Sequence, residues 1–325
     1  MTVPIRILQD HHISGDFGDA FSTADIYRFG LYLGRRLKAL GTPRIVVATD
    51  ARESDRTHVH PLIGGLQGGD CDVTALGTAP YPMLAYAIRS LDSPHAAMMT
   101  AGDDDSPDAI GFRVVIDRVP MASYALKDLF SQSHEAAFND ASGTGRLQET
   151  DLSAGYLRWL LHGSRIHGNI SVLWDPGNGS ASEIVRSLAG LLTGRHVVIN
   201  GGDGPVLARD ESATGLALGN AVVAGGFDLG VALSGDGSRL VMTDNLGRPL
   251  SERHRLFILS TRRERQPVAG NGLLAQRRKA KTDAIKQALK VIQVVAGLPM
   301  NASDLRDRTQ GAEDLGKGST LPPGG

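Results

Sequence analysis

The chain has 325 residues, and its 34 lysines and arginines nearly balance its 35 aspartates and glutamates, giving a net charge of -1. This balance provides no overall electrostatic field that would attract nucleic acid or an anionic membrane. Cys71 is the only cysteine, which excludes a disulfide within the chain and a zinc site built from cysteines.

The first residues lack the charged start and apolar run of a signal peptide, and no apolar stretch reaches membrane-spanning length. We therefore expect a cytoplasmic protein without a membrane partner. The length predicts two domains or slightly more. The 40 glycines and the low aromatic content of 5% favour short elements joined by tight turns, as in an α/β chain.

The first half alternates between predicted helices and strands. Ser22 and Asp25 form the pattern of a capping box, and apolar residues then recur at helical spacing up to Gly41. Short apolar runs predict strands at residues 45–48, 73–76, 96–100 and 111–116. Because helices separate most of these strands, the pattern predicts a layered domain with a mostly parallel sheet.

A polar stretch near residues 131–150 predicts a linker, after which the pattern repeats. Strands are predicted at 170–174, 196–199 and 229–233, and helices near 152–161, 181–192 and 215–224. Both halves end in a strand, a polar loop and a second strand, so segments 96–116 and 229–243 are candidate equivalents in a duplicated unit. We predict domains over residues 1–145 and 146–260.

Residues 261–325 differ in character from the two halves. The run 262–281 is strongly basic, an amphipathic helix follows from Ile285 to Gly297, and the glycine- and proline-rich end predicts a mobile tail. The basic run lacks the interleaved aromatic residues of many nucleic-acid interfaces. We therefore favour a solvated basic helix with a linker and expect no nucleic-acid partner.

The turn from Ser234 to Arg239 joins two predicted strands and has the alternation X-Gly-X-Gly-X. This alternation places Ser234, Asp236 and Ser238 on one side of a tight loop, which is the arrangement needed to chelate a hard cation through oxygen. Only Asp236 is a carboxylate, so the turn offers one negative charge, which offsets little of the free energy needed to dehydrate a cation. The pattern indicates a metal-binding turn that has lost most of its ligands.

Five stretches carry a resemblance to the α-D-phosphohexomutase family of phosphomannomutases and phosphoglucomutases. In chain order they are Asp50-Ala-Arg-Glu-Ser54, Ala79-Pro-Tyr-Pro82, Thr100-Ala101 with Gly111-Phe-Arg113, Asp175-Pro-Gly-Asn-Gly179 and the turn at 234–239. Their order and spacing match the family over residues 5–260. The resemblance implies an α/β fold of two phosphohexomutase-type layered domains, followed by a vestigial third segment at 261–325 that is the remnant of a third domain.

The family transfers phosphate between C1 and C6 of a hexose phosphate, with a phosphoserine and Mg²⁺. The resemblance places Gly102 at the phosphoserine position, where the nucleophile is therefore lost. It implies Mg²⁺ as cofactor and a mannose or glucose phosphate as ligand. Asp236 is then the residual metal ligand, with Ser234 and Ser238 at the degenerate positions. Substrate-binding roles are implied for Arg52, Arg113 and Arg239.

We interpret the chain as a phosphohexomutase-like protein that is catalytically inactive and retains phosphosugar binding. An active mutase with a rebuilt site would need Ser106 as its nucleophile, in a loop made electronegative by four nearby aspartates. These are Asp103, Asp104, Asp105 and Asp108. A regulatory or scaffold protein and a decayed gene product are further alternatives, and the sequence does not choose the hexose, the protein partner or the oligomeric state.

Two clusters of metal-ligating residue types remain. The aspartates at 103–108 could bind Ca²⁺ or Mg²⁺, but they lack EF-hand spacing, and a solvated loop is the favoured interpretation. His11 and His12 are adjacent in an extended segment and would point to opposite faces. We therefore predict that these two histidines are exposed to solvent rather than bound to a metal.

Overall fold

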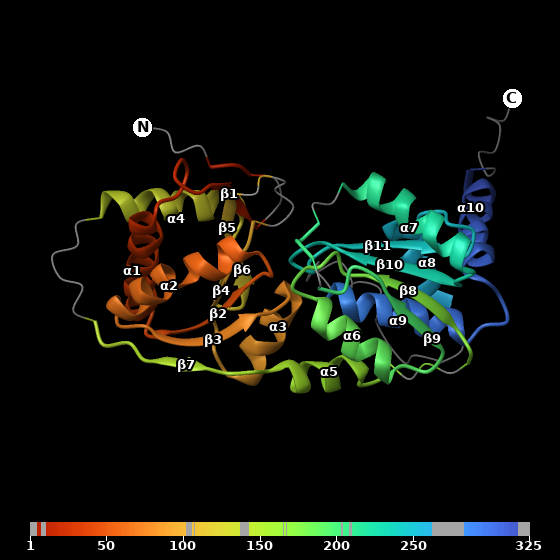
Figure 1. The fold of residues 1–325 in the computed structure, drawn as a ribbon, viewed down its shortest axis with the longest axis horizontal. Helices are drawn as coiled ribbons and strands as arrows, with labels where there is room; N and C mark the ends of the chain where they lie inside the picture. The colour runs from red at the N-terminus through yellow and green to blue at the C-terminus, as the bar shows by residue number, and fades with distance from the viewer. Residues whose placement is uncertain are drawn as a thin grey trace, which may run out of the picture.

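The computed structural model describes residues 5–7, 11–101, 106, 108–136, 143–164, 166, 168–202, 204–207, 210–261 and 283–317. Two sheets, each covered by helices, lie at opposite ends of the molecule in Figure 1. The predicted basic run 262–281 and residues 318–325 of the predicted tail fall outside the described residues. Among the helices that are described, none combines the length and the apolarity needed to cross a membrane.

The first sheet has seven strands in the spatial order β1-β5-β4-β2-β3-β7, with β6 paired to β5. The strands are β1 (Ile13–Asp16), β2 (Arg44–Thr49), β3 (Asp72–Thr78), β4 (Ala96–Met99), β5 (Ala109–Ile116), β6 (Val119–Pro120) and β7 (Leu147–Glu149). The pairs between β2, β3, β4 and β7 are parallel, whereas β5 runs antiparallel to β1 and β4. The sheet is therefore mixed, with the parallel strands on one side.

Helices cover both faces of this sheet. They are α1 (Thr23–Ala39), α2 (Glu53–Gly68), α3 (Tyr81–Ser90) and α4 (Ser123–Glu135). Alternate side chains of β2 separate the two faces: Ile45 and Val47 pack in the core with α1, α2 and α4, while Val46 and Ala48 pack in the core with α3. The capping box predicted at the start of α1 is confirmed, because Ser22 and Asp25 each accept a hydrogen bond from the other's backbone N–H.

The second sheet has four strands in the order β11-β10-β8-β9. Its strands are β8 (Ser171–Asp175), β9 (Arg195–Val198), β10 (Leu229–Leu233) and β11 (Leu240–Asp244), and its helices are α5 (Ser153–Leu161), α6 (Ser182–Leu191), α7 (Glu211–Gly225) and α8 (Glu252–Thr261). The β10–β11 pair is antiparallel, as is the β4–β5 pair of the first sheet. Each half thus contains the predicted strand, loop and strand, and the structure shows that the two strands are antiparallel.

Two elements differ from the simple division expected between the halves. The predicted polar linker includes β7, an exposed edge strand that pairs with β3 although it follows the proposed boundary at residue 145. The predicted helix at Ile285 forms as α9 (Ala284–Ala296) and is followed by α10 (Ala302–Lys317). Helix α9 is buried in the same core as the second sheet, where Ile285 and Ile292 join Val231 of β10. The third segment therefore contributes directly to packing on the second sheet.

Candidate functional site

The turn between β10 and β11 rests on the beginning of α3. Gly237 has a φ of +70°, and a Cβ at this position would lie 3.0 Å from Cβ of Pro80. The backbone N–H of Tyr81 donates to the carbonyl oxygen of Asp236 at 2.8 Å. A glycine is needed both for the left-handed backbone conformation and for the close approach. The turn is therefore part of the contact between the two halves of the molecule.

The carboxylate of Asp236 is fully buried and has partners on both oxygen atoms. Its Oδ1 accepts from the hydroxyl of Ser234 at 2.7 Å and from the N–H of Ser238 at 2.9 Å. Its Oδ2 lies 2.9 Å from both Nε and Nη2 of Arg113, which projects from β5 of the first sheet. The Arg113 guanidinium also lies 4.8 Å from the centre of the Tyr81 ring. A carboxylate and a guanidinium thus meet in the interior, one from each half.

The charge state of Asp236 follows from these partners. Burial would by itself raise the pKa of the carboxyl group, but the positive charge of Arg113 and the hydrogen bonds from Ser238 and Ser234 act in the opposite direction and prevail. The pKa of Asp236 is held well below its usual range. The group is therefore a carboxylate paired with a guanidinium at any pH near neutrality.

A cleft of about 780 Å³ lies between the two halves, and three arginines line it. Arg52 and Arg56 come from the start of α2, and Arg186 comes from α6. The hydroxyl of Ser182, at the first position of α6, is buried and has no hydrogen-bond partner in the described part of the chain. A Cβ at Gly202 would lie 3.6 Å from Nη1 of Arg186 and 3.9 Å from Oγ of Ser182, so this glycine of the cleft wall lies next to both groups.

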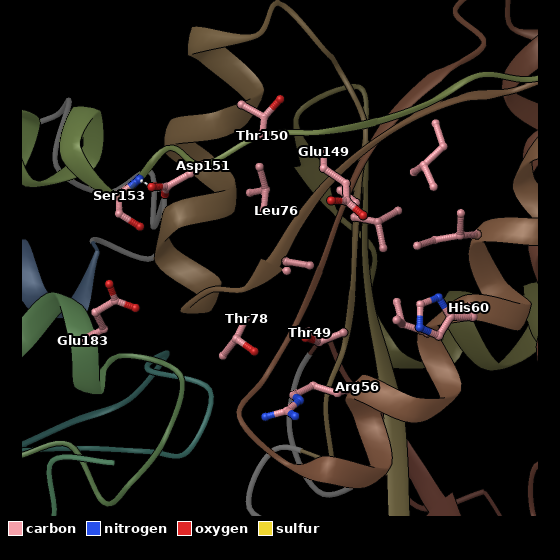
Figure 2. A pocket seen from close by; sticks show the side chains of 17 residues that line it. Thr49, Arg56, His60, Leu76, Thr78, Glu149, Thr150, Asp151, Ser153 and Glu183 are labelled. Carbon is pink, nitrogen blue, oxygen red and sulfur yellow. Dashed lines mark hydrogen bonds between the residues drawn. The ribbon is translucent and has the colours of Figure 1, made fainter. Parts of the chain in front are cut away.

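A second cavity of about 620 Å³ adjoins this cleft and is drawn in Figure 2. Arg56, Thr78 and Glu183 line both cavities, and Figure 2 shows Arg56 and Glu183 on opposite sides with Thr78 between them. Glu149 and Asp151 add two carboxylates to the second cavity. The continuous space therefore has a cationic part near α2 and α6 and an acidic part beyond it. Such a space suits a ligand that carries both an anionic group and several hydroxyl groups.

Ser106 lies beside the first cleft, at the end of the loop that follows β4. Its hydroxyl is hydrogen-bonded to Asp16, and its carbonyl oxygen accepts from Nη1 of Arg52 at 3.4 Å. Asp16 also pairs with Arg6 at 2.8 Å. The hydrogen bonds from Arg6 and Ser106 lower the pKa of Asp16. A carboxylate with a lowered pKa is a weak general base for activating a serine.

A family model for phosphoglucomutase/phosphomannomutase α/β/α domain I matches residues 7–129. A phosphomannomutase/phosphoglucomutase from Pseudomonas aeruginosa is 28% identical over 254 residues, which cover 76% of this chain and 54% of the relative. A phosphoglucosamine mutase from Acinetobacter baumannii is 26% identical over 268 residues, which cover 79% and 60%. The chain is therefore similar to α-D-phosphohexomutases over about three quarters of its length, and residues 7–129 match the model of their first domain.

Solved structures agree with this phosphohexomutase fold. A phosphoglucomutase/phosphomannomutase family protein from Burkholderia thailandensis has a TM-score of 0.80 at 19% identity, covering 93% of this chain and 79% of that chain. The parafusin phosphoglucomutase from Paramecium has a TM-score of 0.68 at 12% identity, covering 87% and 70%. The chain spans about half the length of the curated Pseudomonas relatives that it matches.

The Mg²⁺ that the phosphohexomutase family implies does not fit the turn at 234–239. The turn offers one carboxylate, and Arg113 together with Ser234 and Ser238 already occupies both of its oxygens. Nowhere in the described ranges do three or more histidine, cysteine, aspartate or glutamate side chains gather as a metal site. A cation here would have to displace a buried guanidinium, so no chemical step is assigned to a metal.

The structure separates the residues predicted for the site into three places. Arg52 and Ser106 line the cleft. The contact between the halves holds Arg113, Asp236, Ser234 and Ser238. Arg239 lines a small cavity of about 30 Å³ beside Glu211 and Thr214 of α7. Gly102 and Asp103 to Asp105 lie outside the described residues. The implied roles of these residues remain predictions.

Sequence reasoning missed two cleft arginines and misplaced one histidine. Arg56 follows Arg52 by one helical turn, and Arg186 lies just beyond the Asp175-Pro-Gly-Asn-Gly179 motif, so both positions carried a usable signal. The prediction that His12 is exposed is wrong: the ring is fully buried, and Nε2 lies 2.8 Å from the carbonyl oxygen of Thr100. Pairing of β1 with β5 holds the neighbouring Ile13 opposite Phe112, and the ring of His12 lies next to Thr100.

Proposed function

We propose that this chain binds a phosphorylated hexose in the cleft between its two halves and does not catalyse the phosphate transfer of its family. The observation that carries the proposal is the group of arginines on the cleft, Arg52, Arg56 and Arg186, next to the unpartnered hydroxyl of Ser182. Relatives named as phosphomannomutase/phosphoglucomutase and phosphoglucosamine mutase support a sugar phosphate as the ligand.

The phosphate group is assigned to the α6 side of the cleft. Arg186 supplies planar N–H donors that match phosphate oxygens, and charge-assisted hydrogen bonds of this kind are stronger than neutral ones. Ser182 offers a donor that the folded protein otherwise leaves unused. The first turn of α6 adds backbone N–H groups and the positive end of the helix dipole. Glu183 opposes the anion, and its position in the adjoining cavity favours contact with sugar hydroxyls instead.

The proposed absence of phosphate transfer is supported by the groups that the family reaction requires. Gly102 supplies no side-chain hydroxyl at the position matching the phosphoserine. The carboxylate of Asp236 is neutralised by Arg113, so the positive charge that a metal would bring to the transferring phosphoryl group is missing. These two features favour binding without turnover as the function of the cleft.

A mutase with a rebuilt site is the second candidate. Ser106 lies on the cleft, and its hydroxyl is hydrogen-bonded to the carboxylate of Asp16. In that case Ser106 would be the phosphate acceptor and Asp16 would take its proton. The lowered pKa of Asp16 makes it a poor base, which favours the binding role.

Binding and catalysis are separated by two measurements on the same protein. Glucose 1-phosphate and mannose 1-phosphate should raise the unfolding temperature, because a ligand that binds the folded state stabilises it. Arg186→Gln should weaken the affinity by about tenfold or more, and Ser182→Ala should weaken it to a smaller extent. Arg36→Gln is the matched control, because Arg36 is an exposed arginine on α1 away from the cleft.

The activity measurement is a coupled mutase assay with a hexose bisphosphate activator. We expect no turnover above background, with or without Mg²⁺. Turnover that disappears in Ser106→Ala would instead establish the rebuilt site. Equal sugar-phosphate binding in wild type and Arg186→Gln would refute the assignment of the cleft, whatever the activity.

A further inference from the structure

We propose that the guanidinium of Arg113 replaces a metal ion as the fixed cation at the Asp236 turn, so that the two halves are locked together without metal. This inference concerns the contact between the halves and does not depend on sugar-phosphate binding. It starts from the finding that the turn does not fit Mg²⁺, and it assigns a role to the residue that fills the place beside the carboxylate.

The geometry makes Arg113 a two-point partner. Its Nε and Nη2 both lie 2.9 Å from Oδ2 of Asp236, and Nη2 also donates to the hydroxyl of Ser238 at 3.4 Å. The Tyr81 ring stacks against the guanidinium at 4.8 Å, an arrangement that favours a weakly hydrated planar cation. Both charged side chains are only 1% exposed. Arg113 comes from the first sheet, and Asp236 comes from the turn of the second.

The two serines complete the arrangement. Ser234 donates its hydroxyl hydrogen to Asp236 at 2.7 Å and accepts the N–H of Arg239 at 3.0 Å, so its hydroxyl links the carboxylate to the backbone of the turn. Carboxylates at 234 and 238 would add two negative charges that one guanidinium could not balance. One carboxylate, two hydroxyls and one arginine give a buried cluster without net charge. The serines at positions 234 and 238 and the guanidinium of Arg113 are therefore related, because together they leave the buried cluster without net charge.

The Arg113–Asp236 ion pair affects the stability of the whole molecule because its two residues come from different halves. The same turn receives the backbone N–H of Tyr81 and lies against Pro80. Removing one member of a buried ion pair leaves the other charged and desolvated, which costs far more than losing an exposed pair. A metal-dependent turn would loosen in a chelator. A turn held by Arg113 would not.

The first test measures thermal unfolding of the full chain in EDTA and in millimolar Mg²⁺. The proposal requires the same midpoint in both. Arg113→Met should lower that midpoint by roughly 5–10 °C. Arg118→Met is the matched control, because Arg118 pairs with Asp92 at 3.4 Å on the surface, and its midpoint should stay near that of the wild type.

The double variant Arg113→Met/Asp236→Asn separates loss of charge balance from loss of packing. Because the double variant removes both charges, its midpoint should be higher than that of Arg113→Met and should recover a large share of the decrease. The midpoint of Arg113→Lys should lie between those of Arg113→Met and the wild type. If Arg113→Met does not fold, the midpoint of the double variant and the comparison of EDTA with Mg²⁺ still test the proposal. A rise in the wild-type midpoint on adding Mg²⁺, or a double variant no more stable than Arg113→Met, would overturn the proposal.

Discussion

Gly30 of α1 and Gly65 of α2 face each other where the two helices cross, and neither position has room for a methyl group. A Cβ on Gly65 would lie 2.1 Å from the carbonyl oxygen of Tyr27, and a Cβ on Gly30 would lie 2.4 Å from that of Leu62. These neighbours are backbone atoms, which cannot rotate away as a side chain could. The close approach of the two helices therefore depends on the two glycines.

Gly65→Ala should destabilise the fold, whereas the adjacent Gly64→Ala should not. We expect Gly65→Ala to lower the free energy of unfolding by about 2 kcal/mol or more, because the helices must separate to admit the methyl group. At Gly64 the nearest atom to a Cβ is a Tyr27 ring carbon at 3.7 Å, so alanine fits and its higher helix propensity should stabilise by up to about 1 kcal/mol. Chemical denaturation of both variants checks this, and equal losses would contradict it.

Lys286 connects α9 to the end of α5. Its ammonium group donates to the carbonyl oxygens of Trp159, of Leu160 at 2.9 Å and of His162 at 3.0 Å, and it lies 4.5 Å from the Trp159 ring centre. These carbonyls have no partner within the helix, so the lysine satisfies them. We expect Lys286→Met to cost about 1–3 kcal/mol of unfolding free energy. Lys290→Met, at an exposed position on the same helix, is the control and should change little.

His95 should make stability depend on pH between neutrality and mild acid. The ring is fully buried; its Nδ1 accepts from the N–H of Asp117 and its Nε2 lies 2.7 Å from the hydroxyl of Thr42. Burial lowers the pKa of His95 below its ordinary value of about 6.5; Asp117 opposes the shift and Arg44 adds to it. The unfolded chain therefore binds the proton more readily than the folded one does.

The stabilising contribution of His95 is complete above the pKa of the unfolded state and is lost as the pH falls through the folded value. Unfolding free energy should therefore fall between about pH 7 and pH 5 in the wild type. His95→Gln should make this part of the profile less steep, and His162→Gln, at an exposed position, is the control variant. A profile in His95→Gln as steep as that of the wild type would exclude His95 as the source.

Cys71 should be inert in the folded protein. The thiol is fully buried, and burial together with the charge of Asp72 raises its pKa to about 12. Because the thiolate is the reactive form, an alkylating reagent should label native protein only as fast as the chain opens. In denaturant, one thiol per chain should react rapidly, since Cys71 is the only cysteine. Rapid labelling under native conditions would show that the core around β3 is open.

Local chemistry made several elements predictable. The capping box at Ser22 depends on residues three positions apart, and the helix ending at Gly297 depends on a repeat within one segment. The turn at 234–239 was predicted from its glycines. By contrast, β7 has three exposed residues and no apolar alternation, so its pairing with β3 left no local signal. The same holds for the burial of His12, which depends on a neighbouring strand and loop.

The sequence by itself determined the resemblance to phosphohexomutases and the order of most elements, and it predicted that Gly102, Ser234 and Ser238 stand where this resemblance expects a serine and two carboxylates. It did so because motifs and short-range periodicity are written in consecutive residues. Only the tertiary structure decided the partner of Asp236, which is Arg113 at a separation of 123 residues, and the gathering of Arg56 and Arg186 on one cleft. Sequence spacing does not encode which side chains meet across two packed sheets. Once such side chains are buried together, their partners determine the charge state of each group and the strength of the interaction.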